Sequence, residues 1–243
     1  MAGTWRMPPP PLRASATRAM TMGAAAVVVA ATILRPSLGG GASYPMKAAA
    51  LFVLMMLVAL GHLHDSHPFT TFGLANRITT LRVGVVALVT ALLGEPMTPT
   101  AMTAIAATGL VVSALDGLDG QAARRFGSAS AFGARFDMET DAFFILVLSA
   151  LVWRAGKAGP WILLAGLMRY LFVAAMAMLP WMRRQEPPSV RRKAICVVQV
   201  LGLSLVMLPL FTPPLSTAWC AFVLATLAYS FGVDILWLWR HRG

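Results

Sequence analysis

Residues 116–141 read DGLDGQAARRFGSASAFGARFDMETD, and this stretch decides both the fold and the chemistry that the chain can support. It holds five of the nine acidic residues of a 243-residue chain, namely Asp116, Asp119, Asp137, Glu139 and Asp141. One long apolar run, at about 98–115, precedes it, and a second, at about 132–153, begins within it. The acids therefore stand where two apolar segments meet.

The composition identifies the class of protein to which these segments belong. Hydrophobic residues make up 58% of the chain and charged residues 12%, and the mean hydropathy is +0.73. A soluble domain carries about twice that charged fraction. Crossing a bilayer core takes roughly 20 helical residues, and eight apolar stretches approach that length: 19–35, 46–63, 78–94, 98–115, 132–153, 158–181, 194–212 and 216–238. The sequence predicts an all-α integral membrane protein.

The net charge of +11 is explained by membrane topology rather than by nucleic-acid binding. A nucleic-acid partner is not expected, because the chain lacks the polar surface on which a basic face is built. If the N-terminus is cytoplasmic and eight helices cross the membrane in alternating directions, fifteen basic residues lie on the cytoplasmic side and four on the outer side. This is the bias that the positive-inside rule describes. We expect a bacterial inner-membrane location with the acidic stretch facing the cytoplasm. Residues 19–35 fit either a retained helix or a cleaved signal.

The spacing of the acids predicts a metal site. Asp116 and Asp119 are three residues apart and Asp137 and Asp141 four apart, so each pair shares one helix face, while Glu139 points roughly the opposite way. A short connection makes the two helices antiparallel neighbours with four carboxylates in one pocket. These would repel one another unless protonated or bridged by metal. Oxygen-only ligands suit Mg²⁺, with Mn²⁺ or Ca²⁺ as alternatives, and two such ions could clamp a phosphate or pyrophosphate.

The residues between the acids favour a phosphate ligand. Gly120, Ala123 and Gly133 each lie one helical turn from an acid, and Arg124 adds a cation. Small side chains leave room for a bulky ligand to approach the backbone. Helix packing through small residues explains one such glycine, but not the whole ordered set.

This ordered set resembles a known family. Asp116-x-x-Asp119-Gly120-x-x-Ala123-Arg124, eight residues, Gly133, three residues, Asp137, three residues, Asp141 resembles the signature of the CDP-alcohol phosphotransferase (CDP-alcohol phosphatidyltransferase) family at every position. Asn76-x-x-Thr79-x-x-Arg82 is similar to the family's first-helix pattern. The resemblance covers about residues 73–240. It implies a six-helix catalytic membrane domain over 73–243, preceded by an extension, residues 1–72, with two candidate membrane helices.

The resemblance also implies a reaction. A membrane transferase of phospholipid biosynthesis would move a substituted phosphate from a CDP-linked alcohol, foremost CDP-diacylglycerol, to an acceptor hydroxyl and release CMP. Two Mg²⁺ ions, or Mn²⁺, would be held by Asp116, Asp119, Asp137 and Asp141, and Asp141 would also act as the base. The CDP portion would contact Asn76, Thr79, Gly120, Ala123, Arg124 and Gly133. The resemblance further implies a homodimer working on a CDP-linked lipid and a small alcohol acceptor within membrane lipid.

Basic residues suggest where a phosphorylated acceptor, such as glycerol 3-phosphate or inositol phosphate, would bind. Arg169 is the one basic residue well inside a predicted span, which favours a functional role. The other candidates are Arg135, Arg191, Arg192 and Lys193, for which positive-inside anchoring is an equal alternative. Asp234, near the end of the last span, is expected to reach toward Arg240 and Arg242.

Two other functions stay open at this point. A divalent-cation transporter would also place carboxylates in membrane helices, but it predicts acids near the bilayer midplane and gives no reason for Gly120, Ala123, Arg124 and Gly133. A transferase of the CDP-choline or CDP-ethanolamine type would use diacylglycerol as the acceptor. The sequence does not distinguish between glycerol 3-phosphate, inositol phosphate, serine and choline as the acceptor of a transfer from CDP-diacylglycerol.

Overall fold

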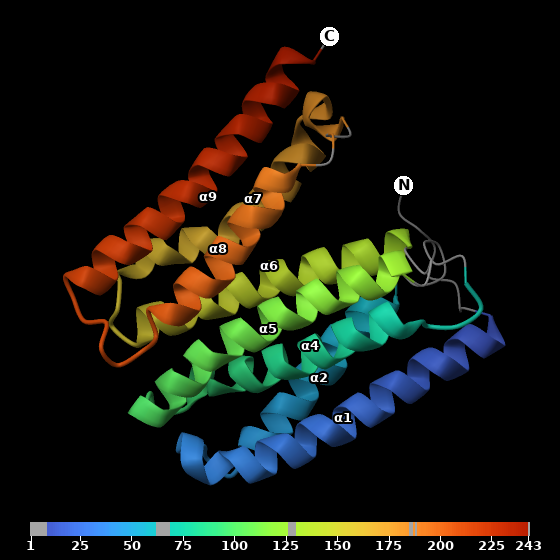
Figure 1. Cartoon of the computed structure of the whole chain (residues 1–243), viewed down its shortest axis with the longest axis vertical. Helices are drawn as coiled ribbons and strands as arrows, with labels where there is room; N and C mark the ends of the chain where they lie inside the picture. Colours follow the sequence, from blue (N-terminus) through green and yellow to red (C-terminus); the bar gives the residue numbers. More distant parts are fainter. Residues whose placement is uncertain (1–8, 62–68, 126–129, 185–186, 188, 243) are drawn as a thin grey trace. The chain divides into compact units, whose positions relative to one another are not determined.

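The structure is a computed structural model, and it describes residues 9–61, 69–125, 130–184, 187 and 189–242, with the backbone alone over 119–125. Helices form all of the regular structure in this described part (Figure 1). The α-helices of the described residues are α1 Pro10–Leu38, α2 Tyr44–Leu60, α4 Leu74–Thr90, α5 Pro99–Arg125, α6 Ala131–Arg154, α7 Leu163–Met178, α8 Val190–Leu205 and α9 Leu215–Arg240. Short 3-10 helices occupy Ala91–Gly94, Pro160–Ile162 and Pro180–Arg183.

These helices confirm the prediction of an all-α integral membrane protein with two helices before a six-helix core. Among the described residues, five segments are long and apolar enough to cross a membrane: Pro10–Leu38, Leu74–Gly94, Pro99–Leu118, Pro160–Met178 and Leu215–Arg240. The helix ends differ from the apolar runs, because hydropathy marks only the part of a helix that is apolar. Thus α1 begins at Pro10, ahead of Arg13 and Arg18, and α5 runs on through the acidic residues to Arg125.

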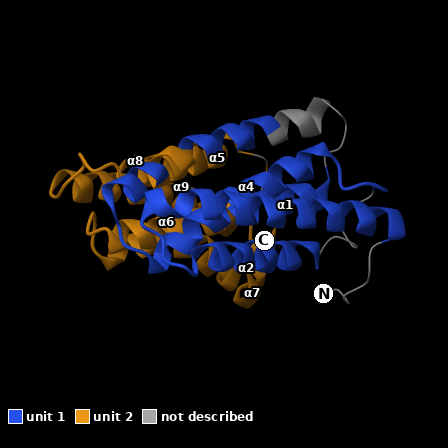
Figure 2. Ribbon diagram, turned by 90° about the horizontal axis from the view of Figure 1, so that it is seen from below, with its two compact units in different colours: residues 1–104, 110–140 blue, residues 105–109, 141–243 orange. Residues whose placement is uncertain are grey.

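The chain forms two compact units (Figure 2). The first consists of Met1–Ala104 and Leu110–Thr140, and the second of Ile105–Gly109 and Asp141–Gly243. Helices α5 and α6 each contribute to both units, and the division in α6 falls between Thr140 and Asp141.

In the first unit, α1 and α2 pack against α4. The two N-terminal helices are joined through Gly39, whose φ of 71° is a left-handed conformation that suits glycine. The buried carboxylate of Glu95, just after α4, accepts hydrogen bonds from the Gly41 N–H and the Lys47 ammonium, both at 2.8 Å. Near the other end, the Ser15 hydroxyl accepts a hydrogen bond from the Phe72 N–H at 3.0 Å. The N-terminal helices are thereby fixed to α4 at both of its ends.

In the second unit, small and polar residues connect the helices. The Gln199 amide of α8 donates a hydrogen bond to the Val223 carbonyl of α9 at 2.7 Å. A Cβ added at Gly166 in α7 would lie 2.3 Å from the Leu146 Cα in α6, so these two backbones approach very closely. Close packing through small residues is typical of membrane helices, because no hydrophobic force drives apolar helices together in lipid.

Candidate active site

Three carboxylates converge where α5 and α6 carry the acidic stretch. Asp116 of α5 and Asp137 and Asp141 of α6 each offer one oxygen, and these oxygens all lie within 4.8 Å of one another. All three residues are half-buried. Glu139 lies outside this group of described acids, as its position on the helix predicts. The sequence spacing therefore identifies three members of the cluster.

The start of α6 is fixed by its own sequence. The Ser130 hydroxyl accepts a hydrogen bond from the Gly133 N–H at 3.0 Å, which satisfies one of the free N–H groups of the first turn. Asp137 follows Gly133 by one turn, and Asp141 follows Asp137 by another turn of the same helix. The cap therefore sets the position from which both acids project.

Arg82 is a member of the site to which sequence reasoning assigned no role. Its side chain is 0% exposed, and one guanidinium nitrogen, Nη1, lies 3.2 Å from Asp116 Oδ1 and also donates to Asp137 Oδ1. The guanidinium thus contacts two members of the cluster at once. The signal available in the sequence was an arginine inside an apolar helix, where a charge needs a partner.

Asn76 and Gly133, both predicted to contact the CDP portion, lie against each other. The Asn76 amide is buried and donates to the Phe72 carbonyl at 2.6 Å. A Cβ added at Gly133 would lie 2.9 Å from Asn76 Oδ1. Thr79, one turn after Asn76 on the same helix, is also buried. Glycine at position 133 therefore allows the first turn of α6 to approach α4.

Cys196 of α8 is a second neighbour of the acids that the sequence does not reveal. Its thiol donates to Asp141 Oδ2 at 3.6 Å, within the range for a sulfur hydrogen bond. The other cysteine, Cys220, is fully buried in α9. Neither residue forms a disulfide.

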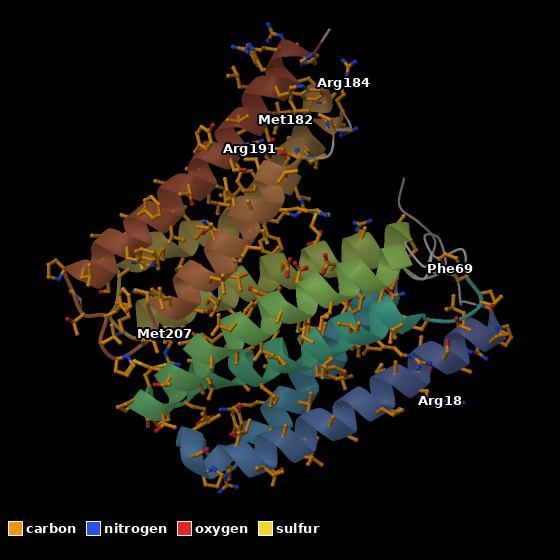
Figure 3. All side chains as sticks on the ribbon, viewed as in Figure 1. Arg18, Phe69, Met182, Arg184, Arg191 and Met207 are labelled. Carbon is orange, nitrogen blue, oxygen red and sulfur yellow. The ribbon has the colours of Figure 1, made fainter. Side chains whose placement is uncertain are left out.

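The predicted acceptor residues differ in their surroundings. Arg191 of α8, labelled in Figure 3, donates to the Ser230 carbonyl and to Asp234 of α9. Arg192 Nη1 lies 3.3 Å from Asp234 Oδ1. Arg169 is half-buried in α7, whereas Arg135 and Lys193 are exposed. Arg191 and Arg192 therefore also connect α8 to α9.

The prediction that Asp234 reaches toward Arg240 and Arg242 is wrong. Its carboxylate instead accepts from Arg191 and Arg192, which belong to a different helix. The physical reason is geometry, since Arg240 lies six residues further along α9, about 9 Å along its axis, and Arg242 lies beyond the end of that helix. Arg242 stacks on the Trp239 ring, with its guanidinium carbon 3.6 Å from the ring centroid.

Part of the predicted site lies outside the described side chains. Asp119, Gly120, Ala123 and Arg124 fall in the last turns of α5, where the structure describes the backbone only. That backbone is helical up to Arg125, so the three-residue spacing of Asp116 and Asp119 does fall within a helix.

The described residues fit a hard divalent cation. Asp116, Asp137 and Asp141 bring carboxylate oxygens within 4.8 Å of one another, and Asp116 and Asp137 keep about a third of their side-chain surface exposed, at 35% and 34%. Oxygen ligands of this kind suit Mg²⁺ and Mn²⁺. A cation could therefore reach the cluster and balance its charge.

The fold and this cluster define a helical membrane protein with a candidate divalent-cation site. A model of the CDP-alcohol phosphatidyltransferase family matches residues 72–233, two thirds of the chain. The protein belongs to this family, a family of transferases that move a phosphatidyl group from a CDP-alcohol with the help of a divalent metal. No curated protein and no solved structure matches the chain.

Proposed function

We propose that the protein is an active transferase that moves a substituted phosphate from CDP-diacylglycerol to an acceptor hydroxyl and releases CMP, as a step of phospholipid biosynthesis. The observation that carries this proposal is the approach of Asp116, Asp137 and Asp141 within 4.8 Å, in a chain of this family. These three acids occupy three of the four acidic positions in the family pattern, and Asp119 occupies the remaining one.

The four aspartates are the proposed ligands of two Mg²⁺ ions, with Mn²⁺ as the alternative. When bound, such ions withdraw charge from a pyrophosphate and make CMP a better leaving group. The approach of three described carboxylates to one another supports this assignment.

Asp141 is the proposed base. Its carboxylate would take the proton of the acceptor hydroxyl while that oxygen attacks the phosphorus that carries the alcohol. The bond between this phosphorus and the bridging oxygen breaks, CMP leaves with the electron pair, and the proton passes from Asp141 to water. The hydrogen bond from the Cys196 thiol to Oδ2 would hold the carboxylate in orientation during this step.

The CDP portion is proposed to bind next to the acids on α4, α5 and α6. The residues are Asn76, Thr79, Gly120, Ala123, Arg124 and Gly133. The contact between Asn76 and Gly133 supports a shared role for the first two turns of α4 and the first turn of α6.

A phosphorylated acceptor would be held by the basic residues Arg135, Arg169, Arg191, Arg192 and Lys193. Because Arg191 and Arg192 share Asp234, their loss should affect stability as well as acceptor binding.

The charge distribution supports an orientation of the protein in the membrane. We propose a bacterial inner-membrane protein whose active site faces the cytoplasm. Residues 73–243 form its proposed catalytic domain, and residues 1–72 form an extension. Two copies are proposed to form a homodimer. The fifteen-to-four bias of basic residues supports the orientation.

A CMP-release screen tests the reaction and identifies its acceptor. Purified protein in detergent with Mg²⁺ would receive CDP-diacylglycerol together with glycerol 3-phosphate, inositol phosphate, serine or choline. A second arm would offer CDP-choline or CDP-ethanolamine with diacylglycerol. We expect acceptor-dependent CMP release in the first arm that stops when EDTA removes the metal. CMP release in the second arm only would show that the donor is CDP-choline or CDP-ethanolamine and not CDP-diacylglycerol. Mg²⁺ flux into liposomes without CMP release in either arm would show that the protein transports cations and is not a transferase.

A further inference from the structure

Arg82 is a charged residue that the proposed reaction does not use. It lies in the middle of α4, within the apolar segment Leu74–Gly94, and its side chain is 0% exposed. An ionised guanidinium so deeply buried costs several kcal/mol unless it stays paired. Arg82 therefore needs a negative partner in every state of the folded protein.

The partners of Arg82 are two of the proposed metal ligands. Nη1 lies 3.2 Å from Asp116 Oδ1 and also contacts Asp137 Oδ1, so one nitrogen bridges carboxylates from α5 and α6. The arginine is fully buried, while the two aspartate side chains are 35% and 34% exposed. The guanidinium thus approaches the carboxylates from the protein interior and leaves their outer side accessible.

We propose that Arg82 is the built-in counter-ion of the acid cluster. It holds Asp116 and Asp137 together when no divalent cation is bound, and its positive charge limits the affinity of the cluster for that cation. Arg82 is a positioning residue in this account and does not contact the substrate. The inference rests on the proposed metal-dependent function, but it concerns metal binding and stability, which are measured without substrate.

Two opposite consequences follow when the guanidinium charge is removed. Two carboxylates that repel each other then remain at a short distance, so the metal-free protein loses stability. A divalent cation then approaches the carboxylates without repulsion from the Arg82 guanidinium, so it binds more tightly and stabilises the variant more than it stabilises the wild type. A merely structural arginine would produce only the first effect.

The test is thermal unfolding of purified full-length protein in detergent during titration with Mg²⁺, and separately with Mn²⁺. For Arg82→Gln we expect a lower unfolding midpoint without metal, a larger metal-induced rise, and about a tenfold lower metal concentration at half effect. Arg82→Lys keeps the charge and should restore a response close to that of the wild type. Lys47→Gln is the matched control. It breaks the pair with buried Glu95, which follows the 3-10 helix Ala91–Gly94 and is not in the acid cluster, so it should lower the midpoint without changing the metal response.

A double variant keeps the inference testable if Arg82→Gln folds poorly. Arg82→Gln with Asp137→Asn removes both charges, so it should be more stable without metal than Arg82→Gln alone. Equal metal responses in wild type and Arg82→Gln, or no recovery in the double variant, would overturn the inference. A wild-type metal response without CMP release would contradict the proposed function alone, and no metal response in the wild type would contradict both.

Discussion

At the scale of the residue, Gly133 determines how closely the first turn of α6 approaches α4. A Cβ at this position would lie 2.9 Å from Asn76 Oδ1 and 3.2 Å from Ser130 Oγ. Asn76 cannot easily move away, because its side chain is buried and its amide is bound to the Phe72 carbonyl at 2.6 Å. The orientation of Asn76 and the position of Asp137 therefore both depend on glycine, a residue without a Cβ, at position 133.

Gly133→Ala should displace Asn76 and shift the start of α6. We expect a loss of about 1–3 kcal/mol in stability, which is typical of an overpacked site, and a higher KM for the CDP-linked donor. Thermal unfolding and CMP release at varied donor concentration measure the two effects. Gly117→Ala is a control for stability, since its added Cβ has no neighbour within 4 Å. Equal unfolding midpoints for the two variants would contradict this view of Gly133.

At the scale of the element, α6 and α7 depend on Gly166. The nearest atom to an added Cβ is the Leu146 Cα at 2.3 Å, which is a backbone atom and cannot rotate aside. Gly166→Ala must therefore separate the two helices, and we expect it to destabilise the protein by at least about 1 kcal/mol.

Gly232→Ala in α9 provides the comparison for Gly166→Ala. No atom lies within 4 Å of its added Cβ, so alanine should be neutral or should stabilise the helix by up to about 1 kcal/mol. Unfolding of both variants in the same detergent measures the difference. Equal stability of Gly166→Ala and Gly232→Ala would contradict the close approach of the α6 and α7 backbones at Gly166.

Lys157 joins the segment after α6 to the segment between α8 and α9. Its side chain is buried, and its ammonium donates to the Leu208 carbonyl at 3.1 Å and to the Phe211 carbonyl. The Ser216 hydroxyl donates in turn to the Lys157 carbonyl at 2.7 Å. Burial lowers the pKa of Lys157 below its usual 10.5.

This lowered pKa predicts how stability changes with pH. Between the native pKa of Lys157 and 10.5 the unfolded chain binds more protons than the native protein, so the contribution of Lys157 to stability increases as the pH rises. The unfolding midpoint of wild type minus that of Lys157→Met should therefore grow over the pH range that ends near 10.5. A difference that stays constant or shrinks over this range would contradict the assignment.

At the scale of the whole molecule, local sequence patterns predicted what depends on local structure. Apolar length predicted eight helices, because a membrane helix must present apolar side chains to lipid. Helical spacing predicted that Asp137 and Asp141 share a face and that Glu139 does not, and the structure confirms both. Helix spacing states which residues share a face, but not which distant helix covers that face.

Partners far apart in the sequence were therefore missed. Arg82 is 34 residues from Asp116 and 55 from Asp137, and Cys196 is 55 from Asp141. For Asp234, the choice of basic residues nearby in sequence proved wrong, because tertiary packing brings Arg191 and Arg192 to it instead. Each of these contacts depends on how the helices pack, which one sequence does not state.

Whether the aspartate cluster catalyses transfer is measured by CMP release from CDP-diacylglycerol. Purified wild type and Asp137→Asn would each be assayed with Mg²⁺ and the acceptor panel. Asp137 belongs to the carboxylate cluster and contacts Arg82, so removing its charge should abolish transfer while the protein stays folded and inserted in the membrane. Unchanged membrane insertion and a cooperative unfolding transition would verify the fold. We predict acceptor-dependent release by the wild type and none by the variant, and turnover retained by Asp137→Asn would contradict the account.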